Sequence, residues 1–410
     1  MPRRALWSAL ALLTLVLPLY SQSTETRAQT LARMGVKPWH TRGLLGKGVK
    51  VAILDSGFRG YRAYLGSALP KTVLTRSFRK DGNLEAKKSQ HGILCAEVVH
   101  ALAPQAQLLL ANWEPNHPVQ FLQALKWARH HGAKILSCSI SISTLSDAEG
   151  GGPVHKELTR LLSQGKDEAL FFACAGNTAE RHWGGDFNAG TYGYHDWGNR
   201  AIDNQVIPWG SDDVSVELCG AKGMDFELLV YDATTRTLLG RARAEASSIH
   251  RCAVIRFRPK EDHTYYARVR RVNGNRGRFH LFVLGGSLKT TRSRGSIPFP
   301  GDGKSVVTIG AVDTRLSRMS YSSCGMGSSR AKPSFVAMVP FQSSWRERPF
   351  TGTSAAAPQA AGLAALLWSG FPKWDAKKVR SILKQSALDL GNDGHDPETG
   401  HGLVRIPGLR

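Results

Sequence analysis

The stretch VKVAILDSGF at residues 49–58 indicates the fold of most of this chain. Its first six residues are mostly apolar with two β-branched valines and an isoleucine, which is typical of a strand buried on both faces of a sheet. Similar apolar runs lie at residues 106–112, 133–142 and 168–175, and helical apolar spacing lies between them at residues 91–102, 119–132 and 154–165. Strands that alternate with helices predict an α/β domain with a parallel sheet and helices on both faces.

Three residues with hydrolytic chemistry stand at the ends of these elements. Asp55 directly follows the first strand, His91 opens the helix at 91–102, and Ser354 opens an alanine-rich helix in FTGTSAAAP. A serine becomes a good nucleophile when a histidine takes its proton and a carboxylate orients that histidine. Functional groups of such folds gather beyond the carboxyl ends of the strands. We therefore expect Asp55, His91 and Ser354 to meet as a catalytic set.

A fourth residue, Asn177 in FFACAGNTA, follows another predicted strand on the same side of the sheet. Its side-chain amide is expected to donate to a developing oxyanion, and the backbone N–H of Ser354 at the helix start is expected to be the second donor.

The segments ILDSG, HGILCA, CAGN and GTSAAAP, in this order, resemble the subtilisin-like serine proteases. The resemblance covers residues 37–186 and 297–407. It implies a serine endopeptidase that hydrolyses peptide bonds in proteins or peptides through an acyl-enzyme intermediate and requires no cofactor. An alternative from another class is a catalytically silent surface-binding protein whose function lies in an inserted module.

That insertion is expected at residues 187–296, where helical patterns stop and short strand patterns follow one another. The pattern predicts a β-sandwich of the jelly-roll kind. The segment also resembles an insertion that a bacterial subgroup of the family carries between the oxyanion asparagine and the nucleophile. The expected organisation is a signal peptide at 1–23, a catalytic domain in two parts at 24–186 and 297–410, and the insertion between them.

Residues 137–143, SCSISIS, resemble the strand that lines the family's primary specificity pocket. By this resemblance Ser139, Ile140 and Ser141 are expected to bind substrate. The family often has glycines where this chain has Ser141 and Ile142, so the sequence names no preferred substrate side chain.

Two residues of the helix at 91–102 need separate interpretation. Cys95 lies about one turn after His91 and is expected to be a small buried residue beneath it. Glu97 departs from the small residue usual in the family. The sedolisins use a glutamate as base, but His91 is present here, so Glu97 is expected to lie at the helix surface or behind the reacting residues.

No metal site is expected among the catalytic residues. The acidic, glycine-rich segment at 389–402 has ligands for a structural calcium, but it lacks the alternating spacing of a calcium loop, which favours a turn-rich closing segment. Of the six cysteines, Cys219 and Cys252 share one local segment and are the expected disulfide pair, although fifteen full pairings are possible.

Arg3 and Arg4, near the start of the sequence, precede an apolar run of about 15 residues, which is typical of a secretory signal peptide. No later segment is long enough to span a membrane. The net charge of +22 predicts electrostatic association with acidic cell-surface material, without a motif for specific nucleic-acid binding. We expect a secreted, periplasmic or cell-surface protein.

Overall fold

The computed structural model describes residues 25–86, 89–163, 168–220, 225–244, 252–273, 277–327 and 331–409. The signal peptide expected at residues 1–23 lies outside these residues. Within the described part of the chain, no helix is both long enough and apolar enough to cross a membrane.

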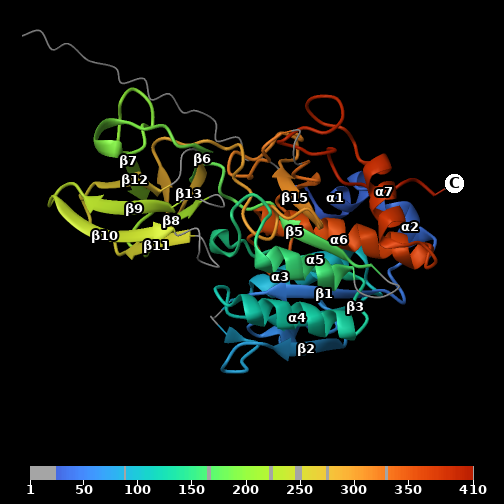
Figure 1. Ribbon diagram of the computed structural model, residues 1–410. Coiled ribbons are helices and arrows are strands. Elements are labelled where there is room, and N and C mark those ends of the chain that lie inside the picture. The colour runs from blue at the N-terminus through green and yellow to red at the C-terminus, as the bar shows by residue number, and fades with distance from the viewer. Residues whose placement is uncertain are drawn as a thin grey trace, which may run out of the picture.

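A seven-stranded sheet in which every neighbouring pair is parallel forms the larger part of the molecule (Figure 1). The strand order is β16-β15-β5-β4-β1-β3-β2. The strands are β1 (Lys50–Asp55), β2 (Val73–Ser77), β3 (Gln107–Asn112), β4 (Ile135–Cys138), β5 (Leu170–Cys174), β15 (Val306–Val312) and β16 (Phe335–Met338). The predicted parallel sheet is confirmed. β4 is shorter than the apolar run at 133–142 suggested, because the chain leaves the sheet after Cys138.

Helices cover both faces of this sheet, as predicted. Val51 and Ile53 of β1 pack into a core with α3 and α6, whereas Ala52 and Leu54 pack on the opposite face with α4 and α5. This alternation follows from the two-residue period of a strand. The helices are α1 (Arg27–Arg33), α2 (Val36–Thr41), α3 (His91–Leu102), α4 (Pro118–His130), α5 (Pro153–Leu162), α6 (Thr353–Gly370) and α7 (Ala376–Ser386).

The alanine-rich helix α6 lies buried against α3 because its residues are small. A Cβ atom at Gly362 would lie only 2.7 Å from the Cβ of Leu102, closer than real Cβ atoms approach one another. The glycine therefore sets the separation of the two helices, and with it the position of the start of α6 relative to the start of α3.

The insertion forms a module of two antiparallel sheets, at the left of Figure 1, with a shared apolar core. One sheet has the order β10-β9-β12-β7-β14 and the other β11-β8-β13-β6. Their strands are β6 (His182–Asp186), β7 (Asn204–Pro208), β8 (Val214–Gly220), β9 (Asp225–Asp232), β10 (Thr237–Ala244), β11 (Cys252–Phe257), β12 (Tyr265–Asn273), β13 (Arg278–Leu284) and β14 (Gly286–Leu288). The predicted inserted β module is confirmed.

The module's first strand, β6, begins at His182, ahead of the boundary expected at residue 187. β6 pairs with β13 through all five of its residues. Its sequence HWGGD has neither the alternation nor the β-branched residues that mark a strand, so the sequence did not predict this strand as part of the module.

The expected disulfide pair is present. Cys219 of β8 and Cys252 of β11 are direct partners across the antiparallel ladder, with Cα atoms 4.2 Å apart. Their sulfur atoms lie 3.4 Å from the carbonyl oxygen of Ser143 and 3.6 Å from that of Ser146, respectively. The disulfide therefore faces the catalytic domain, at the short 3-10 turn Ser143–Leu145 that follows the expected substrate strand.

Candidate active site

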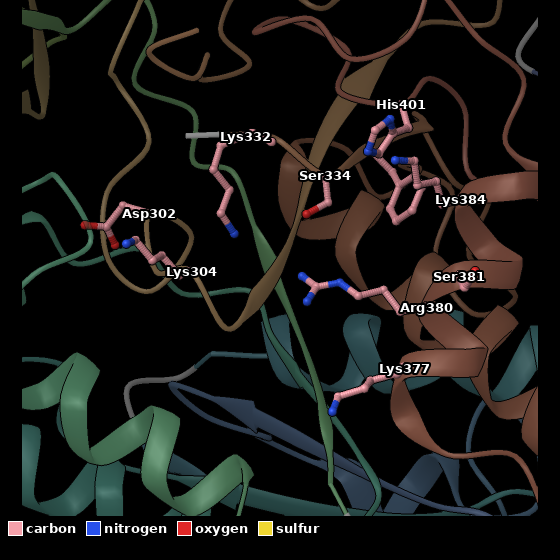
Figure 2. Close-up of a pocket in the computed structure, with 11 residues that line it drawn as sticks. Asp302, Lys304, Lys332, Ser334, Lys377, Arg380, Ser381, Lys384 and His401 are labelled. Carbon is pink, nitrogen blue, oxygen red and sulfur yellow. The ribbon is translucent and has the colours of Figure 1, made fainter. Parts of the chain in front are cut away.

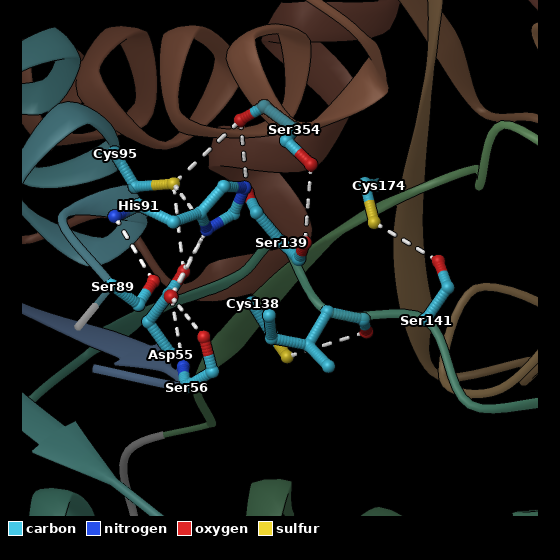
Figure 3. Close-up of polar contacts among 11 residues, drawn as sticks. Asp55, Ser56, Ser89, His91, Cys95, Cys138, Ser139, Ser141, Cys174 and Ser354 are labelled. Carbon is cyan, nitrogen blue, oxygen red and sulfur yellow. Dashed lines mark hydrogen bonds and ion pairs between the residues drawn. The ribbon is translucent and has the colours of Figure 1, made fainter. Parts of the chain in front are cut away.

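The carboxyl end of β1 and the start of α3 bring Asp55 and His91 together. The Nδ1–H of His91 donates to the Asp55 carboxylate, at 2.8 Å from Oδ2 and 3.0 Å from Oδ1 (Figure 3). Asp55 is fully buried, and the backbone N–H of Ser56 also donates to its Oδ1 at 2.8 Å. With Nδ1 protonated, Nε2 of the neutral ring is the acceptor nitrogen.

Burial and the neighbouring side chains shift the pKa of His91 in opposite directions. Burial lowers the pKa of His91, but the Asp55 carboxylate and the neighbouring Cys95 raise it, and the net result is a pKa well above the usual value of 6.5. Asp55 therefore stabilises an imidazolium, which is the state that a histidine reaches after taking a proton from a nucleophile.

Ser354 is the second residue of α6, beside this pair. Its hydroxyl is directed to the backbone carbonyl oxygen of Ser139, to which it donates at 3.2 Å (Figure 3). The carbonyl oxygen of Ser354 accepts in turn from the Ser139 hydroxyl at 3.0 Å. The structure thus places Ser354 at the expected helix start, with its hydroxyl bonded to Ser139 rather than to His91.

Asn177 follows β5 and is held by the residue before Ser354. Its Oδ1 accepts from the backbone N–H of Thr353 at 3.1 Å and from the Thr353 hydroxyl at 2.9 Å. With Oδ1 occupied, the other end of the amide, Nδ2, is the donor. Gly352 borders this donor: a Cβ atom there would lie 3.0 Å from Nδ2. Thr353 and Gly352 were given no role from the sequence, although both stand in the GTS segment beside the nucleophile.

The backbone of the Asn177 turn is fixed from the other side by Arg181. The Arg181 guanidinium donates to the carbonyl oxygen of Asn177 through two nitrogens, with Nε at 2.9 Å. Trp209 of the β module stacks on the same guanidinium, its ring centroid 4.8 Å from Cζ. A residue of the insertion therefore contacts the group that holds the Asn177 backbone.

The three residues expected to bind substrate lie between β4 and the Ser143–Leu145 turn. Ser139 is buried and pairs with Ser354, as described above. Ser141 points elsewhere, with its hydroxyl 3.2 Å from the Cys174 sulfur (Figure 3). Ile140 is half-buried and packs at the edge of the apolar core on that face. Of the three, Ser139 is the one that touches the nucleophile, which the sequence did not indicate.

Cys95 lies one helical turn after His91, as expected. Its sulfur is 3.8 Å from His91 Nδ1 and 3.6 Å from Asp55 Oδ2, and burial raises the pKa of its thiol. The ligand atoms of Asp55, His91 and Cys95 lie within 4.8 Å of one another, and among the described residues they are the one group close enough to hold a metal ion.

Glu97 is buried, not at the helix surface, with 2% of its area exposed. Its carboxylate accepts from the hydroxyl of Ser343 at 2.7 Å, from both the N–H and the hydroxyl of Ser344, and from Arg27 of α1. It therefore ties α1 and the loop before α6 to α3. The sequence could not reveal this, because its partners lie far away along the chain.

Two acids of residues 389–402, Asp389 and Asp396, serve as acceptors within turns. Asp396 accepts from the N–H groups of Glu398 and Thr399, and Asp389 accepts from that of Gly394 at 2.7 Å. A structural calcium in this segment stays a prediction.

The chain has a parallel α/β fold in which an aspartate–histidine pair lies beside a serine at a helix start. These features place it in the class of proteins that carry the residue set of serine hydrolases. A model of the subtilase family of peptidases matches residues 46–202 and 258–402 of this chain. The match covers more than half of the chain, and the gap between its two parts, residues 203–257, lies within the β module. The chain belongs to the subtilase family.

Among curated relatives, the chain is 33% identical to subtilisin DY of Bacillus licheniformis over 129 residues, which are 31% of this chain and 44% of that protein. It is also 33% identical to alkaline elastase YaB of Bacillus sp. (strain YaB) over 112 residues, 27% of this chain and 28% of that protein. The chain thus matches less than half the length of these relatives.

Among solved structures, the fold is similar to that of the CspB protease of Clostridium perfringens, with a TM-score of 0.66 and 15% identity over 92% of this chain and 97% of that one. It is also similar to a lanthipeptide protease, with a TM-score of 0.51 and 18% identity over 92% of each chain. At these identities the likeness concerns the fold alone.

Proposed function

We propose that this protein is an exported serine endopeptidase that uses Asp55, His91 and Ser354 as a catalytic triad. The observation that carries the proposal is the hydrogen bond from His91 Nδ1 to the buried Asp55 carboxylate, beside a serine at the start of a buried helix. This pair fixes the ring orientation and stabilises the charge that a general base acquires.

In the proposed reaction, His91 Nε2 takes the hydroxyl proton of Ser354 as Oγ attacks the scissile carbonyl carbon. The resulting oxyanion accepts hydrogen bonds from Asn177 Nδ2 and from the N–H of Ser354. His91 then protonates the leaving amine, which leaves an acyl-enzyme that water hydrolyses with His91 again as the base. No cofactor takes part, because acid, base and nucleophile are side chains of the chain.

The two oxyanion donors are supported by different features. The first amides of a helix have no intrahelical acceptor, and the helix dipole favours negative charge at this end. Asn177 is oriented by Thr353, and Gly352 keeps the space beside Nδ2 free of a side chain. One such donor contributes roughly 3 kcal/mol to transition-state stabilisation.

The reaction requires Ser354 to leave its hydrogen bond with Ser139. In the proposed reaction, a rotation about the Cα–Cβ bond of Ser354 turns the hydroxyl away from this acceptor and toward His91. The hydrogen bond that breaks is a neutral one and contributes about 1 kcal/mol. Catalytic hydrogen bonds are commonly long or misaligned without substrate.

Covalent labelling tests the proposal. A fluorophosphonate probe is expected to label the purified full-length protein, and the protein is expected to cleave denatured casein. Ser354→Ala should abolish both, whereas Ser369→Ala, near the other end of the same helix α6, should still label and cleave. A folded wild-type protein that neither labels nor cleaves would support the silent surface-binding alternative.

The substrates we propose are proteins or peptides, bound in contact with residues 139–141. The signal peptide expected at residues 1–23 and the net charge of +22 support the proposal of a secreted, periplasmic or cell-surface enzyme held near acidic material. A cleavage profile on a peptide library would define the primary specificity.

A further inference from the structure

A cavity lies at the amino-terminal ends of β15 and β16. Asp55, Asn177 and Ser354 lie on the opposite side, at the carboxyl-terminal ends of the strands. The volume of the cavity is about 560 Å³, within the usual range for small-molecule sites. We call it the basic cavity, because it is lined by Lys304, Lys332, Lys377, Arg380, Lys384 and His401 (Figure 2).

Two cations at the floor of the basic cavity share one neutral acceptor. Lys332 Nζ and Arg380 Nη2 both donate to the carbonyl oxygen of Val306, the latter at 3.2 Å, and Lys332 also donates to the Thr308 hydroxyl at 2.9 Å. Lys332 is only 7% exposed. In the described part of the chain, neither cation forms an ion pair with a carboxylate.

Such an arrangement is unfavourable without a counter-charge. A buried, uncompensated cation loses its hydration without the attraction that would offset the loss. Burial and the charge of Arg380 outweigh the opposing effect of the Asp302 carboxylate and lower the pKa of Lys332 to about 7, and burial lowers the pKa of Arg380.

Further cations surround this pair from two sides. Lys377 and Lys384 project from α7, and Lys304 projects from the segment before β15, across the cavity (Figure 2). These three side chains are exposed, so their ammonium groups are free to move toward a ligand. Lys332 and Arg380 are thus held in place inside the cavity, whereas the side chains of Lys304, Lys377 and Lys384 around it can change conformation.

The nearby acids do not neutralise this set. Asp302 lines the cavity, but its carboxylate accepts from His155 Nε2 at 2.8 Å, from the Gly150 N–H at 2.8 Å and from the Ser146 hydroxyl. Glu168 Oε1 lies 3.7 Å from Lys377 Nζ, but Lys377 is exposed and Glu168 is partly exposed, so water screens this pair and it is weak.

We propose that the basic cavity is a binding site for a small anion that carries two or more phosphate groups. One phosphate would pair with Arg380, whose planar guanidinium suits two phosphate oxygens, and with Lys332; another would meet the outer lysines. A single inorganic phosphate would leave the outer lysines without a partner, and the volume accommodates a larger anion.

Isothermal titration of the full-length protein with tripolyphosphate, at constant ionic strength, tests this site. We expect saturable binding at one site, weakened at least about tenfold in the Arg380→Gln/Lys384→Gln variant, which corresponds to about 1.4 kcal/mol. The matched control is Lys373→Gln/Lys378→Gln. It also removes two charges, at and just before the start of the same helix, but Lys378 lies over Trp374 and neither lysine lines the cavity. Its affinity should stay within about twofold of wild type.

Several outcomes would overturn the proposal: no saturable binding at millimolar tripolyphosphate, equal weakening by the control variant, or orthophosphate binding as tightly as tripolyphosphate. Lys304→Ser provides a second variant on the opposite wall, exposed and outside any secondary-structure element. It should weaken binding as well. Because binding is measured directly and away from Ser354, the result does not depend on the proposed peptidase activity.

Discussion

Removing the Cys219–Cys252 disulfide is expected to destabilise the β module by a calculable amount. The disulfide joins residues 33 positions apart. For a loop of this length, the loop-closure model gives a stabilisation of about 3.7 kcal/mol at 25 °C, because the cross-link restricts the unfolded chain. The same loss is expected on reduction of the wild type and in the Cys219→Ala/Cys252→Ala variant.

Guanidinium unfolding followed by tryptophan fluorescence measures this loss, since Trp183 and Trp197 are buried in the module's core. Reductant provides the control: it should lower the stability of the wild type and leave the double variant unchanged. A loss below about 1 kcal/mol by both routes would show that the cross-link does not restrict the unfolded module as the loop-closure model requires.

Further predictions concern the site and its support. Because Asp55 raises the His91 pKa, NMR titration of the inactive Ser354→Ala protein should give a His91 midpoint above 6.5, and adding Asp55→Asn should lower it; an unchanged midpoint contradicts the pairing. Asn177→Ala should lower kcat about 10²- to 10³-fold with an unchanged unfolding midpoint, and a loss below about tenfold argues against an oxyanion role. Hydrogen bonds from Ser344, Ser343 and Arg27 outweigh burial and lower the Glu97 pKa below 4.5, so its stabilisation is present above pH 4.5 and is lost as pH falls through the folded pKa. Unfolding free energies of wild type and Glu97→Gln should therefore converge toward acid pH; a constant difference refutes this. Gly362→Ala should cost about 1 to 3 kcal/mol in the same assay despite alanine's helix propensity, because its Cβ would collide with Leu102.

Most of the fold could be predicted because the patterns that mark its helices and strands lie within short stretches of the sequence. The helix expected at 91–102 matches α3, and the run at 106–112 differs from β3 by one residue. Both have clear apolar periodicity and definite ends. β2 and the glycine-rich β6 were missed, since β2 is largely exposed and β6 lacks apolar alternation.

The candidate site was predictable in its membership but not in its contacts. Asp55, His91, Asn177 and Ser354 stand at element ends, where topology alone brings them to one edge of the sheet. The orientation of the Ser354 hydroxyl toward Ser139 depends on a side-chain rotation that no pattern encodes. The burial of Glu97 depends on partners up to 247 positions away.

The contacts of Arg181 connect the β module directly to the proposed oxyanion site. Arg181 holds the Asn177 carbonyl, supports Trp209 and accepts a backbone hydrogen bond from Val283 of β13 at 2.9 Å. A second connection runs from Glu217 of β8 to the Ser143 hydroxyl. The module thus contacts both the turn that carries Asn177 and the loop after residues 139–141. Deleting the insertion would remove the contacts that support these two segments of the proposed site.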